Sequence, residues 1–216
     1  MLFRDRTEAG QRLADKLLTY AGRPDLLVLA LPRGGVPVAF EVAKALNAPL
    51  DIFLVRKLGV PGRKELVFGA IASGGVRVLN QDLVQTLGIS DRSIEAITAE
   101  EERELERRER VYRGDHFPMQ VSGRTVILVD DGIATGSSMR AAVAALRMHR
   151  PARIIVAVPV ASPSACEELV AEVDELVCVS KPELFYAIGQ WYEDFPQVTD
   201  EELQDLLQRA SKQEVR

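Results

Sequence analysis

Two adjacent carboxylates stand where a run of apolar residues ends. The segment VILVDDGIATGSS (126–138) places Asp130 and Asp131 directly after four apolar residues of the kind that fill buried strands. In an open parallel sheet, ligands bind beyond the carboxyl ends of the strands, and adjacent side chains there point to different sides. Ionised carboxylates accept hydrogen bonds. The pair is therefore suited to neighbouring hydroxyls of one ligand, such as the cis diol of a ribose.

The residues after the carboxylates are small and hydroxylated. Gly132 and Gly136 allow unusual backbone angles, and the amides at the start of the next helix favour an anion. Thr135, Ser137 and Ser138 add hydroxyl donors. Either serine could equally be a plain N-cap of that helix. The joint spacing favours a phosphate-binding loop over a capped helix with an acidic loop.

Strands and helices must alternate to bring such loops to one edge of a sheet. Apolar runs of strand length occur at 25–31, 50–57, 124–130, 152–160 and 175–180, and helical patterns at 5–20, 36–48, 137–149 and 164–173. Apolar strands joined by helices form parallel sheets that are covered on both faces. We expect an α/β fold with an open, mainly parallel twisted sheet flanked by helices and a small hood or insertion.

The middle of the chain departs from this alternation. LGVPGRKELVFGAI, which begins at residue 58, mixes glycine, proline and basic residues and predicts a long mobile loop, followed by a hairpin that turns at Gly74 and Gly75. Residues 91–113 predict a solvated, ion-paired helix that leans on the domain through three apolar residues, Ile94, Ile97 and Leu105. We expect one domain over 1–216, with this charged insertion at about 90–113 and an aromatic and helical C-terminal segment at about 183–212.

Composition narrows the class of protein. The 216 residues carry 27 basic and 32 acidic side chains, a net charge of −5, so no basic footprint for duplex nucleic acid is expected. Two cysteines and two histidines, far apart in sequence, predict neither a zinc site nor a disulfide framework. No apolar run is long enough to cross a bilayer, so a cytoplasmic location is the expectation. Neither GxGxxG nor GxxxxGK[ST] occurs, which disfavours a dinucleotide-binding oxidoreductase.

The segment 126–138 resembles the phosphoribosyl-diphosphate (PRPP) binding motif of type I phosphoribosyltransferases. The order of chemistries matches: four apolar residues, two acids, a spacer, then Thr-Gly and small hydroxylated residues. The resemblance implies that Asp130 and Asp131 hold the ribose 2′ and 3′ hydroxyls and belong to the catalytic residues. It also implies a 5′-phosphate cradle made of Ile133, Ala134, Thr135, Gly136, Ser137 and Ser138.

Two further segments are similar to elements of that family. LPRGG after the first strand resembles the pyrophosphate loop, which implies that Arg33, Gly34 and Gly35 contact the diphosphate. VRKLGVPGRKELVFGAI lies where the family keeps a flexible catalytic loop. The resemblance implies catalytic roles for Arg56 and Lys57, which would lend positive charge to the departing pyrophosphate. Arg63 and Lys64 could close as a lid or form a solvated basic hairpin.

The resemblance implies transfer of 5-phosphoribosyl from PRPP to a nitrogenous base or amine, an enzyme of nucleotide metabolism or salvage. Mg²⁺ is expected to come with the PRPP oxygens, without a dedicated protein cage. The chain also looks like bacterial phosphoribosyltransferase-domain proteins whose base is unassigned, and a homodimer is plausible from the family. A non-catalytic PRPP- or nucleotide-binding regulator is the alternative, because a fold does not guarantee turnover.

Base recognition is the open half of the expected site. Family members acting on 6-oxopurines commonly carry an acid where this chain has Ala134, whereas the adenine-type spelling has alanine; the acceptor base stays open. GQWYEDF (189–195) gathers Trp191 and Tyr192 beside two acids, a set that could stack and bond a heterocycle. The same aromatics could instead pin the C-terminal segment to the domain.

Overall fold

Five parallel strands form the centre of the molecule. The computed structural model describes residues 2–114 and 118–214, without the side chains of 64, 65, 213 and 214. The strands lie in the order β2-β1-β6-β7-β8, and every neighbouring pair is parallel: Leu26–Ala30 (β1), Leu50–Ile52 (β2), Thr125–Val129 (β6), Arg153–Val160 (β7) and Glu175–Ser180 (β8). The chain goes from β1 to β2 on one side and to β6 on the other. The order of strands therefore reverses between β1 and β6, the place where open α/β sheets bind ligands.

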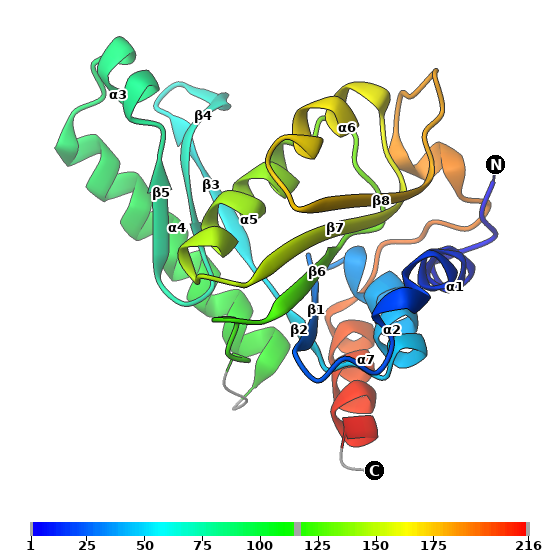
Figure 1. Cartoon of the computed structure of the whole chain (residues 1–216). Coiled ribbons are helices and arrows are strands. Elements are labelled where there is room, and N and C mark those ends of the chain that lie inside the picture. Colours follow the sequence, from blue (N-terminus) through cyan, green and yellow to red (C-terminus); the bar gives the residue numbers. More distant parts are fainter. Residues whose placement is uncertain (1, 115–117, 215–216) are drawn as a thin grey trace.

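Helices cover both faces of this sheet (Figure 1). One face carries Arg6–Leu17 (α1), Gly35–Leu46 (α2) and Asp200–Glu214 (α7); the other carries Ser137–Met148 (α5) and Pro163–Val170 (α6). Alternate strand residues serve the two cores, with Val28 and Ile127 in one and Leu29 and Leu128 in the other. Strands buried on both faces need continuous apolar runs, and the predicted α/β fold is confirmed.

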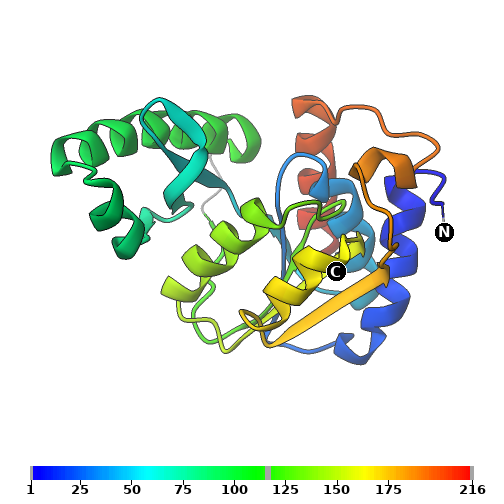
Figure 2. The ribbon, with the colours of Figure 1, turned by 90° about the horizontal axis from the view of Figure 1, so that it is seen from above.

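A second, smaller unit follows β2. Three antiparallel strands and two helices compose it: Val55–Val60 (β3), Arg63–Ala72 (β4), Val76–Leu79 (β5), Gln81–Leu87 (α3) and Asp91–Arg113 (α4). Figure 2 shows the unit set apart from the main sheet. The helix expected at 91–113 is α4, and Ile94 and Leu105 are buried in the core as predicted, with Ile97 packed against it. The short helix α3 was not predicted.

The expectation of a long mobile loop after residue 58 is wrong. Residues 55–72 form a β-hairpin, in which Pro61 and Gly62 make the turn with Gly62 at φ 75°. The register of the two strands shifts at Gly59, which is paired with Val67. The glycines that suggested a loop are therefore the turn residue Gly62 and the site of this irregularity, Gly59. The apolar run at 50–57, which had suggested one strand, is divided between β2 and β3, which belong to different sheets. The hairpin turn at Gly74 and Gly75 is confirmed.

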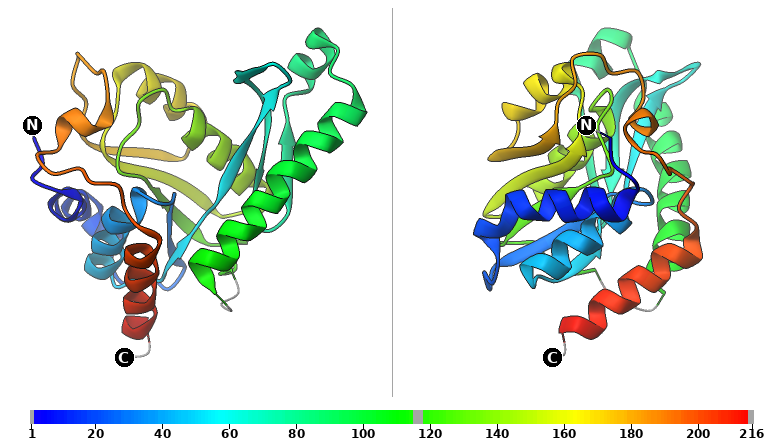
Figure 3. Two further views of the ribbon diagram at one scale, coloured as in Figure 1. Left: turned by 180° about the vertical axis from the view of Figure 1, so that it is seen from behind. Right: turned by 90° about the vertical axis from the view of Figure 1, so that its right-hand side faces the viewer.

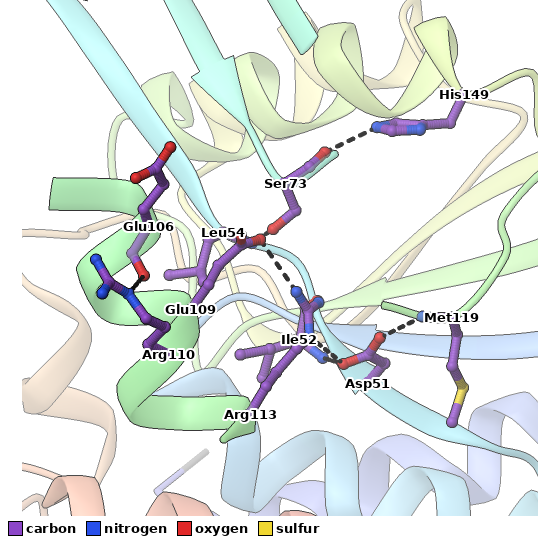
Figure 4. A network of polar contacts seen from close by, with 10 residues as sticks. All are labelled: Asp51, Ile52, Leu54, Ser73, Glu106, Glu109, Arg110, Arg113, Met119 and His149. Atoms are coloured by element: carbon purple, nitrogen blue, oxygen red, sulfur yellow. Dashed lines mark hydrogen bonds and ion pairs between the residues drawn. The ribbon is translucent and has the colours of Figure 1, made fainter. Parts of the chain in front are cut away.

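A buried ion pair fixes the second unit to the main sheet (Figure 4). Arg113, the last residue of α4, donates from Nε to Asp51 Oδ1 at 3.1 Å and from Nη2 to the Ile52 carbonyl at 2.5 Å. The other Asp51 oxygen accepts from the Met119 amide at 2.8 Å. The chain leaves the main sheet after Ile52 and returns near Met119, so one cluster holds both connections.

The first residues of the chain lie beside the segment around residues 191–194, which is orange in Figure 3. The Phe3 amide donates to the Trp191 carbonyl, and the Glu193 amide donates to the Phe3 carbonyl, both at 2.8 Å. Two short 3₁₀ helices complete the described elements, Leu18–Tyr20 (η1) and Ile188–Trp191 (η2). Within the described ranges, no helix has the length and apolarity to cross a membrane.

Candidate active site

Two loops meet at the carboxyl ends of β1 and β6, and glycine makes their approach possible. A Cβ on Gly34 would lie 2.1 Å from Asp131 Oδ2, and one on Gly35 would lie 2.8 Å from the Val129 carbonyl oxygen and 2.9 Å from Asp130 Cα. Real side chains do not approach so closely. The two glycines of PRGG are therefore required by contact with the carboxylate loop, a reason that the sequence pattern alone did not supply.

Asp131 is enclosed and paired. Its side chain and that of Arg6 are each 10% exposed, and Arg6 Nε donates to Asp131 Oδ2 at 2.9 Å. The Tyr192 hydroxyl donates to the Asp131 carbonyl at 2.6 Å. Burial raises the pKa of Asp131, and the charge of Arg6 opposes that rise. One predicted ribose-binding carboxylate is thus held in place by α1 and by the C-terminal segment.

Asp130 differs from its neighbour in having no cation of its own among the described contacts. Its Oδ1 accepts from the Asp131 amide at 2.8 Å. Burial and then the negative charge of Asp131 raise the pKa of Asp130 well above the usual value. Two carboxylates so close cannot both ionise easily without a compensating group. A bound ligand that donates hydroxyl protons would supply part of that compensation.

The loop after the carboxylates opens into α5, where the Ser137 amide makes one long bond, 3.4 Å, to Thr135 Oγ1. Gly136 is the N-cap at φ 75°, and no side chain bonds to the cap. Ser137 is the first helical residue and Ser138 the second, so neither serine is the N-cap and that alternative is wrong. Thr135 and both serines are exposed. An anion could displace the long bond from the Ser137 amide to Thr135 and accept from the amides and exposed hydroxyls at this helix start.

The rest of the loop is fixed from below. The Ile133 amide donates to the Val160 carbonyl at 2.9 Å, and Ser162 Oγ donates to the Ala134 carbonyl at 2.6 Å. Ile133 is buried, and its side chain joins the core under α5 and α6. Only the outer part of the predicted phosphate cradle, from Thr135 onward, is open to a ligand through side chains.

Arg56 and Lys57 lie on opposite faces of β3. Lys57 Nζ donates to Ser137 Oγ at 3.2 Å, which brings the lysine to the start of α5. Arg56 instead pairs with Glu101 of α4, with Nε and Nη2 at 2.7 and 2.6 Å from Oε2. Successive side chains of a strand point to opposite faces. The structure therefore brings Lys57, and not Arg56, to the other predicted site residues.

Arg33 reaches toward the C-terminal helix. Its Nη1 donates to Asp200 Oδ1 at 3.1 Å, and both side chains are partly exposed. A cavity of about 240 Å³ lies beside this pair, lined by Arg33 and residues 197–201.

Of the two residues predicted as a lid, Arg63 is exposed at the start of β4, and the side chain of Lys64 is outside the described part of the chain.

The aromatic residues near the C-terminus pack against the protein. The Tyr192 ring lies between Phe3, with centroids 5.5 Å apart, and Phe195, with centroids 4.7 Å apart. Trp191 stacks on Phe185 at 6.3 Å, and its buried Nε1 has no hydrogen-bond partner among the described residues. Tyr192 is buried. These contacts favour the interpretation that the aromatics pin the C-terminal segment over stacking of a base by Tyr192.

A larger cavity lies away from these residues. It measures about 710 Å³ between β2, α4 and α7 and includes Leu50 at the amino end of β2. Its most buried polar residues, Asp51 and Arg113, are bonded to each other. Asp130 and Asp131 lie instead at the carboxyl end of the sheet, so this cavity is separate from the candidate site. In the described ranges, no three or more histidine, cysteine or acidic side chains are grouped so that they could hold a metal ion.

The fold and the two loops that meet after β1 and β6 define the class: an α/β protein whose candidate ligand site lies where the strand order of a parallel sheet reverses. A family model of the phosphoribosyl transferase domain matches residues 4–195, and the chain belongs to the type I phosphoribosyltransferase family. The match includes both carboxylates, both loops and the small unit.

Relatives of this chain support that assignment. A Mycobacterium tuberculosis protein provisionally named a phosphoribosyl transferase is 44% identical over 211 residues, 98% of this chain and 47% of that protein. The chain thus spans about half the length of the mycobacterial relatives it matches. The bifunctional protein PyrR of Chloroflexus aurantiacus is 32% identical over 129 residues, 58% of this chain and 65% of that protein.

A solved structure shares the whole arrangement. The crystal structure of the protein TT1426 from Thermus thermophilus is 44% identical in sequence, with a TM-score of 0.88 that covers 97% of this chain and 99% of that one. The small unit and the C-terminal segment are therefore parts of a shared architecture.

Two charged residues of the site were missed from the sequence. Arg6 and Asp200 contact the predicted site residues Asp131 and Arg33, respectively. Nothing in the sequence separates Arg6 from Arg12, which has a partly exposed ion pair with Glu8 on the same helix. The only usable signal was the position of each residue in the first turn of a helix, which is too common to be informative.

Proposed function

We propose that this protein is an enzyme that transfers the 5-phosphoribosyl group of PRPP to a nitrogenous base or amine and releases pyrophosphate. The observation that supports it most is the meeting of four features at one switch point: the carboxylate pair, the glycine contact with the β1 loop, the open start of α5, and Lys57. The family to which the chain belongs supports the same class of function.

In the proposed reaction, Asp130 and Asp131 accept hydrogen bonds from the ribose hydroxyls and position the sugar. The amides and hydroxyls at 135–138 bind the 5′-phosphate. The nitrogen of the acceptor forms a bond to C1′ while the bond from C1′ to the pyrophosphate oxygen breaks, and the leaving group keeps that electron pair. The acceptor proton passes to solvent. Positioning and charge stabilisation supply most of the rate.

Positive charge at the leaving group comes from this chain's own cations. Lys57 is the proposed partner of the departing pyrophosphate, because its exposed ammonium reaches the site from β3 and its bond to the Ser137 hydroxyl can be exchanged for a ligand. Arg33 would exchange Asp200 for the diphosphate. Arg56 is left out of this role because it is paired with Glu101 on the far face of β3.

Mg²⁺ fits this site as a companion of PRPP. The chain offers two carboxylates there, one of them already bonded to Arg6, and such a hard ion keeps waters and binds substrate phosphates. When bound, Mg²⁺ would neutralise charge on the diphosphate. Ala134 has no proton to exchange, so the proposed acceptor is one that needs no acid from this position.

The test is release of pyrophosphate from PRPP and Mg²⁺ in the presence of a panel of purine and pyrimidine bases and amines. Release with at least one acceptor, and its loss in Asp130→Asn, is the expected result. Asp82→Asn, an exposed carboxylate in α3, is the matched control. A folded protein that binds PRPP without turnover across the panel would support the regulatory alternative. One that shows no PRPP-dependent rise in melting temperature would contradict both.

A further inference from the structure

Asp131 lies among charged and titratable groups that come from three parts of the chain. In the described residues these groups are Asp130 on the same loop, Arg6 from α1 and Tyr192 from the C-terminal segment; the β1 loop contributes the backbone of Gly34. Burial, and next the charge of Asp131, raise the pKa of Tyr192 far above its usual range, so its hydroxyl stays a donor. Among these groups, Arg6 is the cation that is paired with the Asp131 carboxylate.

The guanidinium of Arg6 is clamped on three sides. Its Nε donates to Asp131 Oδ2 at 2.9 Å, its Nη1 donates to the Pro196 carbonyl at 2.7 Å, and its Cζ lies 3.8 Å from the centroid of the Phe195 ring. The backbone of Arg6 begins α1, whose N-cap Asp5 accepts from the Glu8 amide. The group therefore cannot turn away from Asp131 without the loss of all three contacts.

We propose that Arg6 is a positioning residue of the ribose site: it holds the Asp131 carboxylate ionised and oriented as an acceptor for ligand hydroxyls. The inference rests on the proposed function for the identity of the ligand. Arg6 occupies Oδ2, so the other oxygen is the one offered to a hydroxyl. A residue 125 positions away in the sequence thus completes the carboxylate pair.

Removal of the Arg6 charge should change the pKa of Asp131 in one direction only, because that charge lowers it. Without Arg6 the pKa of Asp131 rises further, a smaller fraction of Asp131 is ionised at a given pH, and PRPP binding fails at higher pH than in the wild type. A rise of about one unit corresponds to about tenfold weaker binding on the acid limb. A merely structural role would lower the melting temperature without moving this limb.

The experiment measures binding of PRPP with Mg²⁺ by calorimetry from about pH 5 to pH 9 in the wild type and three variants. Arg6→Gln is expected to weaken binding about tenfold at the acid end and to move the acid limb upward. Arg6→Lys keeps the charge and should restore part of the affinity. Arg12→Gln removes a partly exposed arginine from the same helix and should bind as the wild type does.

A second readout needs no ligand. Carbon-13 NMR of labelled aspartates follows the titration of Asp131, assigned with Asp131→Asn, and should show its pKa raised in Arg6→Gln. An unchanged titration overturns the inference whether or not PRPP binds. Failure of the wild type to bind PRPP would refute the proposed function, while a shifted titration would still support the role of Arg6. If Arg6→Gln does not fold, Arg6→Lys and Phe195→Leu replace it. Both keep the charge but loosen the contacts that orient it, so PRPP binding should weaken while the acid limb moves little; unchanged binding in both overturns the inference.

Discussion

The two sides of the proposed site are built differently. The carboxylate edge, Asp130 and Asp131, is held by buried contacts with α1, the β1 loop and the C-terminal segment. The cationic side, Arg33 and Lys57, consists of exposed or partly exposed side chains, each with one replaceable partner, Asp200 or Ser137. The sugar side is therefore preorganised, and the pyrophosphate side must exchange partners when a ligand binds.

This difference matches the chemistry that each side would perform. A sugar that must be positioned benefits from groups whose orientation is fixed before binding. A leaving group that must depart benefits from side chains that can follow it and then let it go. The contrast predicts that substitutions at the carboxylate edge change folding and binding together, whereas those on the cationic side change function with little effect on stability.

The largest effect is expected for Asp131→Asn. The change leaves the Arg6 guanidinium buried without its charge partner, and removal of one partner of a buried pair costs about 3–5 kcal/mol. The free energy of unfolding from urea denaturation should fall by that amount, and PRPP binding should be lost. Asp82→Asn should change neither. A stable Asp131→Asn protein would mean that the edge is not braced as described.

Gly34→Ala tests the contact between the two loops. The new methyl group would lie 2.1 Å from Asp131 Oδ2, so the Asp131 carboxylate or one of the two loops must move. Overpacking costs about 1–3 kcal/mol, and a displacement near 1 Å at the site can weaken function about 100-fold. Gly75→Ala, at φ 74° with open space around it, carries only a backbone penalty. Equal affinity for PRPP in both variants would contradict the requirement for close approach.

Lys57→Gln probes the cationic side. Because the ammonium is exposed, the free energy of unfolding should change by less than about 1 kcal/mol. The rate of pyrophosphate release should fall by about 100-fold, as for loss of one group that stabilises developing negative charge. Arg77→Gln, which removes the exposed ion pair between Arg77 of β5 and Glu95 of α4, is the control. A stability loss without a rate loss would reverse the proposed division between the two sides.

The pH dependence of stability tests the carboxylate that has no cation of its own, Asp130. The folded pKa of Asp130 is raised above its unfolded value, so the folded state binds more protons, and this residue's contribution to stability falls as pH rises from about 4 through the folded pKa. Asp130→Asn removes that loss. Compared with the wild type, the variant should gain stability as pH rises above about 4, by about 1.4 kcal/mol per unit of pKa shift. Thermal unfolding at several pH values measures it.

The smallest effect is expected for Asp200→Asn. The Arg33–Asp200 pair is 32% and 40% exposed, so its removal should cost less than about 1 kcal/mol. Arg33 would no longer need to leave a partner, and pyrophosphate with Mg²⁺ should bind tighter by up to about fivefold. Calorimetry against Glu202→Gln, an exposed residue of the same helix, is the measurement. Weaker binding would show that Asp200 orients Arg33 instead of competing for it.

Local patterns were sufficient for the main sheet and for the carboxylate edge. The apolar runs of β1, β6 and β7 are continuous because both faces are buried, which makes their type and position readable from the sequence. Asp130 and Asp131 come directly after such a run, so their place at the sheet edge follows from the run itself. The open start of α5 follows from the small residues beside it.

The small unit and the bracing contacts were not readable in this way. Glycine and proline at 59–62 make a tight hairpin turn, but the same residues also occur in loops, and only pairing with β4 distinguishes the two. The opposite directions of Arg56 and Lys57 depend on β3 being a strand. The contact of Arg6 with Asp131 depends on the packing of both ends of the chain, which no local pattern encodes.

The ion pair between Asp51 and Arg113 has a mechanical consequence. It holds both connections of the small unit at one point, while Lys57 lies six residues further along, a span of up to about 20 Å at strand spacing. Asp51 is thus the point about which a rotation of the small unit would move Lys57. A rotation of about 5° at Asp51 would displace the Lys57 ammonium by about 2 Å, enough to make or break its bond to Ser137. The buried ion pair and the contact of His149 with the Ser73 carbonyl therefore together set how finely the lysine is positioned at α5.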